Sequence, residues 1–240
     1  MPKTTVIITG ASRGIGFEIA KCFARLGHFT LYALSRNKNG LGRLASECAG
    51  LNKTSKLFPV LFDFESFLKE PAGFMKSLPG KPRNISVLIN NAGCLINKPF
   101  DQVKIEEAVQ MLRVNFLGPA MLIKEMLPYM GRVGSTHIVN IGSMGGFQGS
   151  SKYPGLSYYS ASKAALANIT ECLSMELKDR RVFCNCLALG AVQTEMFMKA
   201  FPGYKAPVKP KEIAGFICDF ALNGHKFMNG KIIPVALSNP

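Results

Sequence analysis

Short apolar runs rich in β-forming residues alternate with amphipathic stretches along the whole sequence. Strands are predicted at Thr4–Thr9, Phe29–Ser35, Lys56–Phe62, Ser86–Asn90, His137–Ile141, Val182–Leu189 and Lys231–Val235. Helices are predicted near residues 15–26, 41–49, 65–77, 102–129 (one helix or two), 157–179 and 211–222. Apolar strands that are each followed by a helix indicate an α/β fold with a doubly wound parallel sheet of about seven strands. Ligands of such sheets bind beyond the carboxyl ends of the strands.

Length and composition predict a single domain spanning residues 1–240, with 48% hydrophobic and 18% charged residues. No run approaches the ~20 apolar residues of a membrane-spanning helix. The seven cysteines are an odd number and none has Cys-x2-Cys spacing, so we expect a cytoplasmic protein with reduced thiols and no metal site. Cys184 and Cys186, on one face of a predicted strand, are interpreted as small buried hydrophobes.

The net charge of +14 would attract anions broadly. One interpretation is an enzyme that handles phosphorylated or acidic ligands, and the other is a nucleic-acid-binding protein. The lysines and arginines are scattered and form no basic stripe, which favours the first interpretation.

A glycine-rich loop connects the first predicted strand to the first predicted helix, with the sequence Thr9-Gly10-Ala11-Ser12-Arg13-Gly14-Ile15-Gly16. Glycines at such a junction let the backbone turn tightly and approach a ligand without Cβ obstruction. The helix that follows offers free N–H groups and a positive dipole to a diphosphate. The spacing is Gly-x3-Gly-x-Gly and not the Gly-x-Gly-x2-Gly of most dinucleotide folds.

The residues after the second and third strands predict which dinucleotide binds. The second strand ends at Ser35-Arg36, where an acid would bind the ribose of NAD and an arginine suits a 2′-phosphate. Arg13 could bind the same phosphate, with Ser12 and Ser35 as additional hydroxyl donors. The third strand leads into Asp63-Phe64, which we also assign to the cofactor site. Asp63 could accept a hydrogen bond from the adenine amino group or cap the next helix.

Tyr159 and Lys163 are four residues apart in a predicted helix, so the phenol and the ammonium lie on one face, one turn apart. An ammonium beside a phenol is expected to lower the tyrosine pKa from about 10 toward neutral pH. That change would make the tyrosine usable as a general acid or base. Ser143 lies sixteen residues upstream, after an apolar run. The spacing alone also fits a solvated helix face, so the interpretation depends on the other motifs.

Several motifs follow one another in a set order: Thr9-Gly10-x3-Gly14-x-Gly16, Asn90-Asn91-Ala92-Gly93, Asn115 within a helix, Ser143 after Ile138-Val139-Asn140-Ile141-Gly142, and Tyr159-x3-Lys163. In these motifs the sequence resembles the short-chain dehydrogenase/reductase family, and the resemblance covers nearly all 240 residues. It implies a Rossmann-type fold, an NAD(P) cofactor and hydride transfer. With the two arginines, the expected cofactor is NADP(H).

The resemblance implies a catalytic set of Asn115, Ser143, Tyr159 and Lys163. Tyr159 would give its proton to a carbonyl oxygen as hydride arrives at the carbon, or remove it in the oxidative direction. Ser143 would hydrogen-bond the same oxygen. Lys163 would hold the cofactor ribose and lower the Tyr159 pKa, and Asn115 would bind a water that links Lys163 to solvent.

The resemblance implies further cofactor contacts. Asn91, Ala92 and Gly93 would shape the adenine-ribose side, and the main chain at Gly190–Val192 with Thr194 would contact the nicotinamide.

The chain departs from the family pattern in three places. Leu189 precedes Gly190 where relatives usually carry proline, which loosens the turn beneath the nicotinamide. The interval 144–157 is longer than usual and could form a flap over the substrate or a surface bulge. The segment 195–210 is short, which predicts reduced substrate-covering helices and an open pocket. Its partial walls would be Phe197, Met198, Phe201 and Tyr204.

The leading hypothesis is an NADPH-dependent reductase of a ketone or aldehyde, or the reverse alcohol oxidation. A 3-oxoacyl-carrier-protein reductase fits the basic charge, but the short 195–210 segment and the ending Gly230-Lys231-Ile232-Ile233-Pro234-Val235 argue against it. Pteridine, sugar-alcohol and general carbonyl substrates stay open. The alternative is a cofactor-binding sensor or a nucleic-acid-binding protein on the same fold, for which only the charge and Leu189 speak.

For partners, the sequence predicts a small-molecule substrate, no membrane and no nucleic acid. The family resemblance also implies a homodimer or homotetramer formed through the helix that carries Tyr159. Small outer residues would permit that packing, and they are Ala161, Ala164, Ala165 and Ala167.

Overall fold

One parallel sheet forms the centre of the computed structural model, which describes residues 4–237. Residues 1–3 and 238–240 of the predicted domain lie outside the described residues. The strand order is β3-β2-β1-β4-β5-β6-β7, and every pair is parallel. The strands are β1 (Thr4–Thr9), β2 (Phe29–Ser35), β3 (Lys56–Leu61), β4 (Val87–Asn90), β5 (Thr136–Ser143), β6 (Val182–Leu189) and β7 (Ile232–Val235). The predicted doubly wound sheet is confirmed, with its order reversing between β1 and β4.

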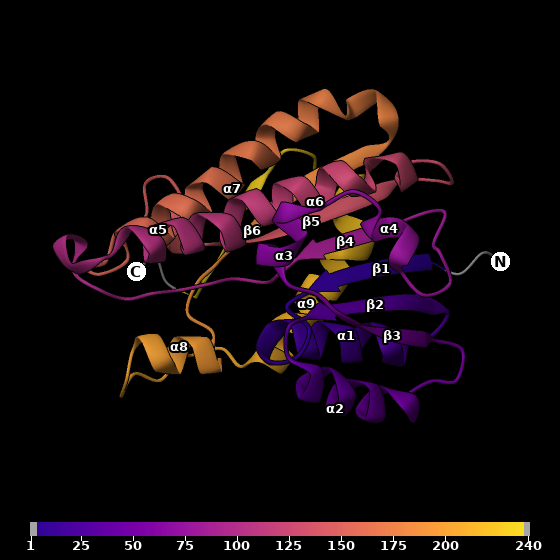
Figure 1. Cartoon of the computed structure of the whole chain (residues 1–240), viewed down its shortest axis with the longest axis horizontal. Helices are drawn as coiled ribbons and strands as arrows, with labels where there is room; N and C mark the ends of the chain where they lie inside the picture. The colour runs from indigo at the N-terminus through magenta and orange to yellow at the C-terminus, as the bar shows by residue number, and fades with distance from the viewer. Residues whose placement is uncertain (1–3, 238–240) are drawn as a thin grey trace.

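Helices cover both faces of this sheet, with α5, α6 and α7 on one side and α1, α2 and α9 on the other (Figure 1). The short helix α8 lies apart from both layers (Figure 1). The helices are α1 (Gly14–Leu26), α2 (Lys38–Ala49), α3 (Phe64–Lys69), α4 (Phe74–Ser77), α5 (Ile105–Leu112), α6 (Gly118–Met126), α7 (Ser157–Glu176), α8 (Glu195–Ala200) and α9 (Pro210–Asn223).

Local chemistry explains where these helices differ from the predicted ones. The single helix predicted at 65–77 is two short helices, because Pro71 cannot continue α3 and Gly73 adopts a positive φ of 86° before α4. The range 102–129 contains α5 and α6, joined by the π-helical turn η2 (Arg113–Leu117). Helix α8 was not predicted. It begins at Thr194, whose hydroxyl accepts a hydrogen bond from the Phe197 N–H at 3.1 Å.

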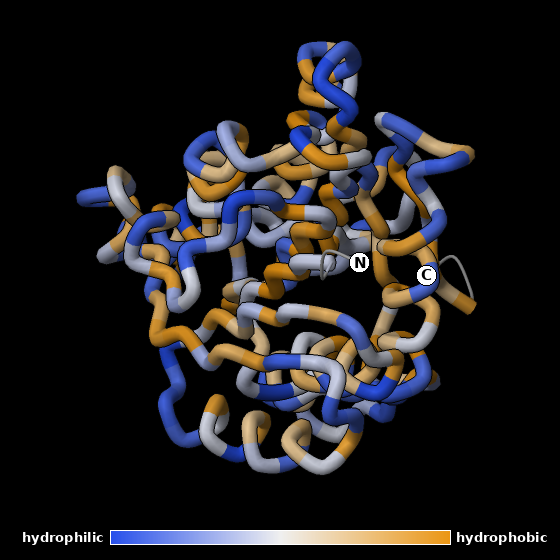
Figure 2. Tube along the Cα trace, turned by 90° about the vertical axis from the view of Figure 1, so that its right-hand side faces the viewer, coloured by the Kyte–Doolittle hydropathy of each residue, from blue (hydrophilic) through white to orange (hydrophobic). Residues whose placement is uncertain are grey.

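The central strands are buried on both faces, and their side chains alternate between two hydrophobic cores. Val6 and Ile8 point into the core beneath α1, α2 and α9, whereas Ile7 points into the core beneath α6. Hydrophilic residues lie mainly on the outer loops and helix turns (Figure 2). The predicted burial of Cys184 and Cys186 is confirmed, since neither is exposed. These cores fix the strand ends, where the polar motifs gather.

Helix α7 uses one of its alanines differently from the prediction. Ala161 and Ala164 are exposed, but Ala167 is buried and packs inward with Leu166. The prediction that Ala167 lies on the outer face was therefore wrong. The homodimer or homotetramer stays a prediction that would use the remaining exposed residues of this helix.

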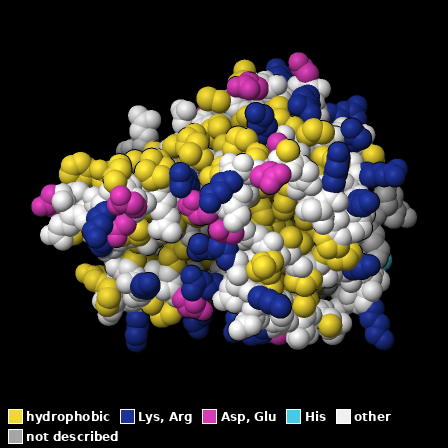
Figure 3. Space-filling model, in the orientation of Figure 1, with side chains coloured by type: hydrophobic (Ala, Val, Ile, Leu, Met, Phe, Trp, Pro, Cys, Tyr) yellow, Lys and Arg dark blue, Asp and Glu magenta, His cyan; other side chains and the backbone are white. Residues whose placement is uncertain are grey.

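Charge is spread over the surface. Figure 3 shows Lys and Arg side chains interspersed with hydrophobic and acidic ones on the face it presents, without a continuous basic stripe. Within residues 4–237, no helix is both long and apolar enough to span a bilayer. In the same residues, no three His, Cys, Asp or Glu side chains gather as a metal-binding cluster.

A buried histidine on β5 is held in its neutral form by its partners. His137 Nδ1 lies 3.0 Å from the Ala221 carbonyl oxygen, and Nε2 lies 3.0 Å from Asn185 Nδ2. The Asn185 amide is oriented by bonds to the Met228 carbonyl and the Lys231 N–H. Nδ1 therefore carries the proton and Nε2 accepts. A second proton would face the Asn185 amide donor, and burial accordingly lowers the pKa of His137 to about 4.

The neutral His137 predicts a loss of stability in mild acid. The unfolded chain takes up the proton near pH 6.5 and the folded protein only near pH 4, so stability falls as pH drops through this window. The expected loss is up to about 3 kcal/mol, measured as the free energy of unfolding in urea between pH 7 and pH 4. His137→Gln should flatten this part of the profile, and an unchanged profile in that variant would contradict the assignment.

Candidate active site

A cleft of about 1350 Å³ opens at the carboxyl ends of the strands. Its volume exceeds the roughly 300–1,000 Å³ of a site for one small ligand, so two ligands can lie side by side. The cleft is lined by Gly10, Ser12, Arg13, Gly14, Ile15, Ser35, Arg36, Asp63, Phe64, Asn91, Ala92, Gly93, Ser143, Tyr159, Lys163, Gly190, Val192 and Thr194. Two residues predicted for the site, Gly16 and Asn115, are not part of its lining.

The glycine loop forms a cradle that has no room for larger side chains. A Cβ on Gly10, whose φ is +70°, would lie 2.8 Å from Ala92 Cα. A Cβ on Gly16 would lie 2.5 Å from both the Gly10 carbonyl oxygen and Asn91 Nδ2. Arg13 at the N-cap of α1 makes no side-chain capping bond, which leaves the first N–H groups of the helix for a ligand.

The residues predicted for a phosphate lie at the ends of β1 and β2. The Ser35 hydroxyl donates to the Ser12 hydroxyl at 2.7 Å, which joins the two strand ends. Arg36 Nε lies 3.8 Å from Asp63 Oδ1, and both side chains are exposed enough to reorient. Asp63 occupies the N-cap position of α3 but makes no capping bond, so its carboxylate faces Arg36 and the cleft instead.

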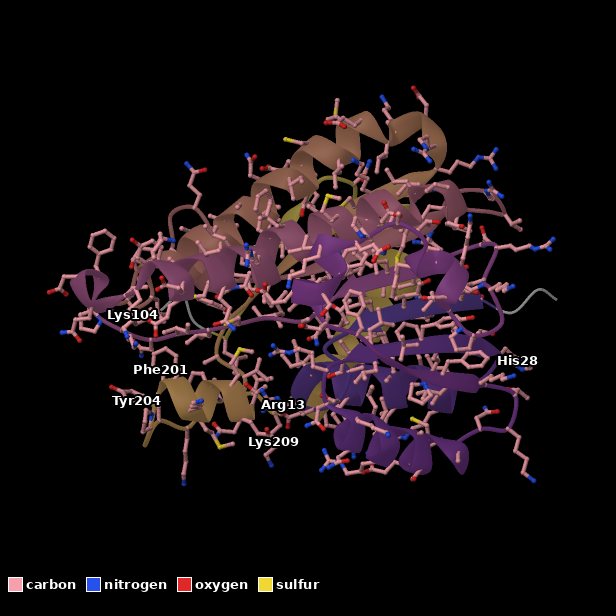
Figure 4. The ribbon with its side chains drawn as sticks, viewed as in Figure 1. Arg13, His28, Lys104, Phe201, Tyr204 and Lys209 are labelled. Atoms are coloured by element: carbon pink, nitrogen blue, oxygen red, sulfur yellow. The ribbon has the colours of Figure 1, made fainter. Side chains whose placement is uncertain are left out.

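Arg13 makes an ion pair that the sequence did not predict. Its Nη1 donates to Glu195 Oε2 at 2.8 Å, although the two residues are 182 positions apart. Glu195 is the first residue of α8, and Figure 4 shows Arg13 beside that helix. Both side chains are more than half exposed, so the pair contributes ~0–1 kcal/mol to stability. The Arg13 guanidinium can therefore exchange this carboxylate for a phosphate.

Tyr159 on α7 and Ser143 at the end of β5 both line the cleft, and the Ser143 hydroxyl is close enough to the phenol to influence its pKa. Ser143 also accepts from the Gly145 N–H at 3.2 Å. Burial raises the pKa of Tyr159 above its ordinary value, and the nearby Ser143 hydroxyl only partly opposes this. The prediction that the neighbouring ammonium lowers this pKa was wrong for the protein without ligands, because desolvation of the phenolate dominates.

Lys163 follows one turn later on α7 and also reaches the cleft, so the predicted shared face is confirmed. Its ammonium donates to the Ile141 carbonyl oxygen at 2.8 Å. Burial disfavours the charged form and lowers the pKa of Lys163 to about 8, with Cys186 opposing the shift. The lysine is therefore anchored to β5 and not to the phenol, which explains why it does not control the Tyr159 pKa.

Asn115 lies behind the wall of the cleft, in the π-helical turn η2. Its Oδ1 accepts from the Cys94 N–H at 2.7 Å, and its Nδ2 donates to the Cys94 carbonyl and the Ser162 hydroxyl. These bonds join the loop after β4 to α7. Both Nδ2 hydrogens are committed, so within the side chain only Oδ1 can take part in the expected water link to Lys163.

Leu189 ends β6, and Gly190 follows directly after it. Leu189 pairs with Ser143 as the last residue of β6, and the Gly190 N–H donates to the Val235 carbonyl at 3.0 Å. A proline at position 189 is thus not needed to hold this turn, because β7 holds it through Val235.

The loop segments contribute cleft residues that the sequence prediction missed or misassigned. Phe197, Phe201 and Tyr204 line the cleft as predicted, but Met198 does not and is 46% exposed. Met196 lines it in place of Met198, because the turn of α8 places Met198 away from the cleft. Only a prediction of α8 from the Thr194 cap could have found this. Further lining residues that were missed are Leu95, Asn97, Tyr153, Pro154, Leu156 and Glu195.

The doubly wound sheet brings a glycine cradle, a serine, a tyrosine and a lysine together at its strand ends. This combination of fold and site defines the class of protein. The family described as short chain dehydrogenase matches residues 4–205. The chain belongs to the short-chain dehydrogenase/reductase family of oxidoreductases.

Individual relatives match most of the chain. An NADP-dependent 3-hydroxy acid dehydrogenase of Schizosaccharomyces pombe is 34% identical over 91% of this chain and 86% of its own length. A 3-oxoacyl-(acyl-carrier-protein) reductase of Thermotoga maritima is 29% identical over 95% of this chain and 94% of its own length. A Beutenbergia cavernae protein assigned to the NAD(P)-dependent gluconate 5-dehydrogenases, crystallised with NADP at low occupancy, has a TM-score of 0.83 and 28% identity. That match covers 98% of this chain and 96% of the Beutenbergia chain.

The crowding around Gly16 predicts that the cradle resists even a methyl group. Gly16→Ala should lower the free energy of unfolding by about 1–3 kcal/mol, although alanine is the better helix former. Gly42→Ala in α2 is the matched control, because its Cβ would meet nothing within 4 Å. It should raise stability by about 0.5–1 kcal/mol. Urea unfolding of both variants checks this, and equal stabilisation by both would refute the close approach.

Proposed function

We propose that this protein reduces a ketone or aldehyde with hydride from NADPH and that Tyr159 is the general acid. The observation that carries the proposal is that Tyr159, Ser143 and Lys163 line the same cleft as the glycine cradle, with Lys163 one helical turn from Tyr159. Proton donors and a dinucleotide cradle in one cleft are what carbonyl reduction requires. The names of the Schizosaccharomyces and Thermotoga relatives describe reactions that interconvert a ketone and a secondary alcohol, which supports the same bond chemistry here.

The cradle fits a dinucleotide phosphate. Cβ atoms on Gly10 and Gly16 would collide with backbone, and the uncapped start of α1 faces the cleft. Arg36 and Arg13 supply two guanidinium groups for a 2′-phosphate, and the acids now paired with them, Asp63 and Glu195, are not buried. Lys163 would hold the ribose hydroxyls, and the backbone at Gly190–Val192 with Thr194 would contact the nicotinamide. The chemistry that NADPH supplies there is a hydride for the carbonyl carbon.

The residues of the chain supply the proton and hold the oxygen. The phenol of Tyr159 donates its proton to the carbonyl oxygen, while the Ser143 hydroxyl hydrogen-bonds the same oxygen and stabilises its developing charge. Lys163, anchored on Ile141, brings a positive charge near the phenolate that remains. Asn115 holds the loop after β4 against α7 through its hydrogen bonds to Cys94 and Ser162. This fixes the position of α7, and with it the position of the Tyr159 phenol relative to Ser143.

The raised pKa of Tyr159 is consistent with the role of general acid that the proposal gives it. A phenol whose pKa is raised by burial stays protonated and can act as an acid. In the oxidative direction the same group would act as the base.

Removing the phenol oxygen should abolish the reaction without disturbing the fold. Tyr159→Phe should lower kcat for NADPH oxidation with a carbonyl substrate by about 10²–10⁴-fold, while the Kd for NADPH stays within a few-fold. Tyr158→Phe is the matched control. Its ring stacks on Phe100 at 5.6 Å and lies outside the cleft lining, so it should retain activity. Retention of activity in Tyr159→Phe would refute the assigned acid.

The arginine pair predicts a preference for NADPH over NADH. Arg36→Ala should raise the KM for NADPH by about tenfold and leave the KM for NADH nearly unchanged, because only NADPH carries the 2′-phosphate. Arg43→Ala, which removes a similarly exposed arginine from α2 outside the main cleft, should change neither value. Equal affinity of the unaltered protein for both cofactors would contradict the phosphate site.

A further inference from the structure

The part of the cleft that lies beyond the cofactor cradle, here named the substrate lobe, is formed by residues 95–97, 153–156 and 196–204. Its side chains are mostly apolar or aromatic and include Leu95, Leu156, Met196, Phe197 and Phe201. The rings of Phe197 and Phe201 lie 5.1 Å apart and form one aromatic surface. Figure 4 shows Phe201 at the end of α8 that is remote from Arg13. This surface is therefore separate from the residues assigned to the phosphate.

Hydrogen bonds join the three segments of the substrate lobe into one structure. Asn97 Nδ2 donates to the Ala200 carbonyl oxygen at 2.8 Å, which ties the end of α8 to the loop after β4. The Lys98 N–H donates to the Gly155 carbonyl at 3.1 Å, which ties the same loop to the long segment after Ser143. Because its walls are linked in this way, the lobe is a formed pocket and not a chance gap between loops.

No basic side chain of the substrate lobe is available to a substrate anion. Among the described residues that line the cleft, only Arg13, Arg36 and Lys163 are basic, and none belongs to the lobe. Lys98 and Lys152 border it and both are engaged, whereas Lys199 and Lys205 are exposed and are not among the residues that line the cleft. Lys98 forms an ion pair with Glu107, and Lys152 donates to two loop carbonyls and the Ser150 hydroxyl at 2.7–3.0 Å. A carboxylate in this lobe would lose hydration without gaining a cationic partner.

We propose that the substrate lobe binds the uncharged, apolar flank of an aryl or alkyl ketone or aldehyde and discriminates against substrates that carry a carboxylate. This inference rests on the proposed reductase function and specifies its substrate class. The proposed substrate class therefore differs from the 3-hydroxy acids that the name of the Schizosaccharomyces relative describes. Phe201 and Leu95 are the specificity-determining residues, because they line the lobe with apolar surface from two different segments.

A matched substrate pair tests the proposal. Methyl 4-acetylbenzoate and 4-acetylbenzoate share the same aryl ketone and differ in a carboxylate that is ionised at pH 7. With saturating NADPH, kcat/KM should be at least about 30-fold higher for the ester, the penalty expected for a buried anion without a partner. Methyl levulinate and levulinate repeat the comparison on an alkyl skeleton and should show the same order.

Two variants locate the discrimination. Leu95→Arg should raise kcat/KM for the acid by about tenfold or more, because it supplies the missing cation. Phe201→Ala should raise the KM for the ester several-fold with less change in kcat, because it removes apolar contact. An equal or higher kcat/KM for the acids in the unaltered protein would overturn this inference and leave the reductase proposal intact.

The outcomes distinguish the two proposals even if no substrate of the pair is turned over. Absence of NADPH oxidation with all four compounds, in protein that binds NADPH, would count against the reductase proposal. The Kd values of the ester and the acid for the NADP⁺-loaded protein, measured by calorimetry, would then test whether the substrate lobe discriminates against a carboxylate. Tighter binding of the ester supports it, and equal or tighter binding of the acid overturns it.

Discussion

The hydrogen bonds between the ends of β1 and β4 are the constraint on which the rest of the site depends. The Thr9 hydroxyl accepts from the N–H groups of Asn91 and Ala92, both at 3.0 Å, and Asn91 Nδ2 donates back to the Thr9 and Gly10 carbonyls. These bonds close the point where the strand order reverses. They hold the glycine loop in close contact with the loop after β4, so that a side chain at Gly16 would collide with Asn91 and Gly10. The same contact directs the start of α1 into the cleft.

Burial decides the chemistry of the reactive groups more than their neighbours do. Desolvation raises the pKa of the Tyr159 phenol and lowers the pKa of the Lys163 ammonium to about 8. Both shifts oppose charge, so the protein without ligands has a neutral acid ready beside Ser143 and a lysine that is only moderately stable as a cation. A negatively charged cofactor in the cleft would favour the charged lysine. Cofactor binding and the protonation state of the site are therefore linked.

The fold and the central site could be predicted from the sequence because their signals are local. Apolar strands and the Tyr159-x3-Lys163 spacing each depend on a few consecutive residues, and strand ends of a parallel sheet meet at one edge. The Arg13–Glu195 pair could not be predicted, since its partners are 182 residues apart and α8 has only one strong signal, the Thr194 cap. The direction of the Tyr159 pKa shift could not be predicted either, because the sequence spacing identifies Lys163 as a neighbour but does not show how deeply the phenol is buried.

The most direct test of this account is a crystal structure of the protein with NADPH and a slowly reacting aryl ketone. The account predicts the ketone oxygen within hydrogen-bond distance of both Tyr159 Oη and Ser143 Oγ. It also predicts the 2′-phosphate against Arg36 and the aryl group against Phe201. A ketone bound outside the cleft, or a carbonyl oxygen that contacts neither the phenol nor the serine hydroxyl, would contradict the central claim that Tyr159 protonates the substrate.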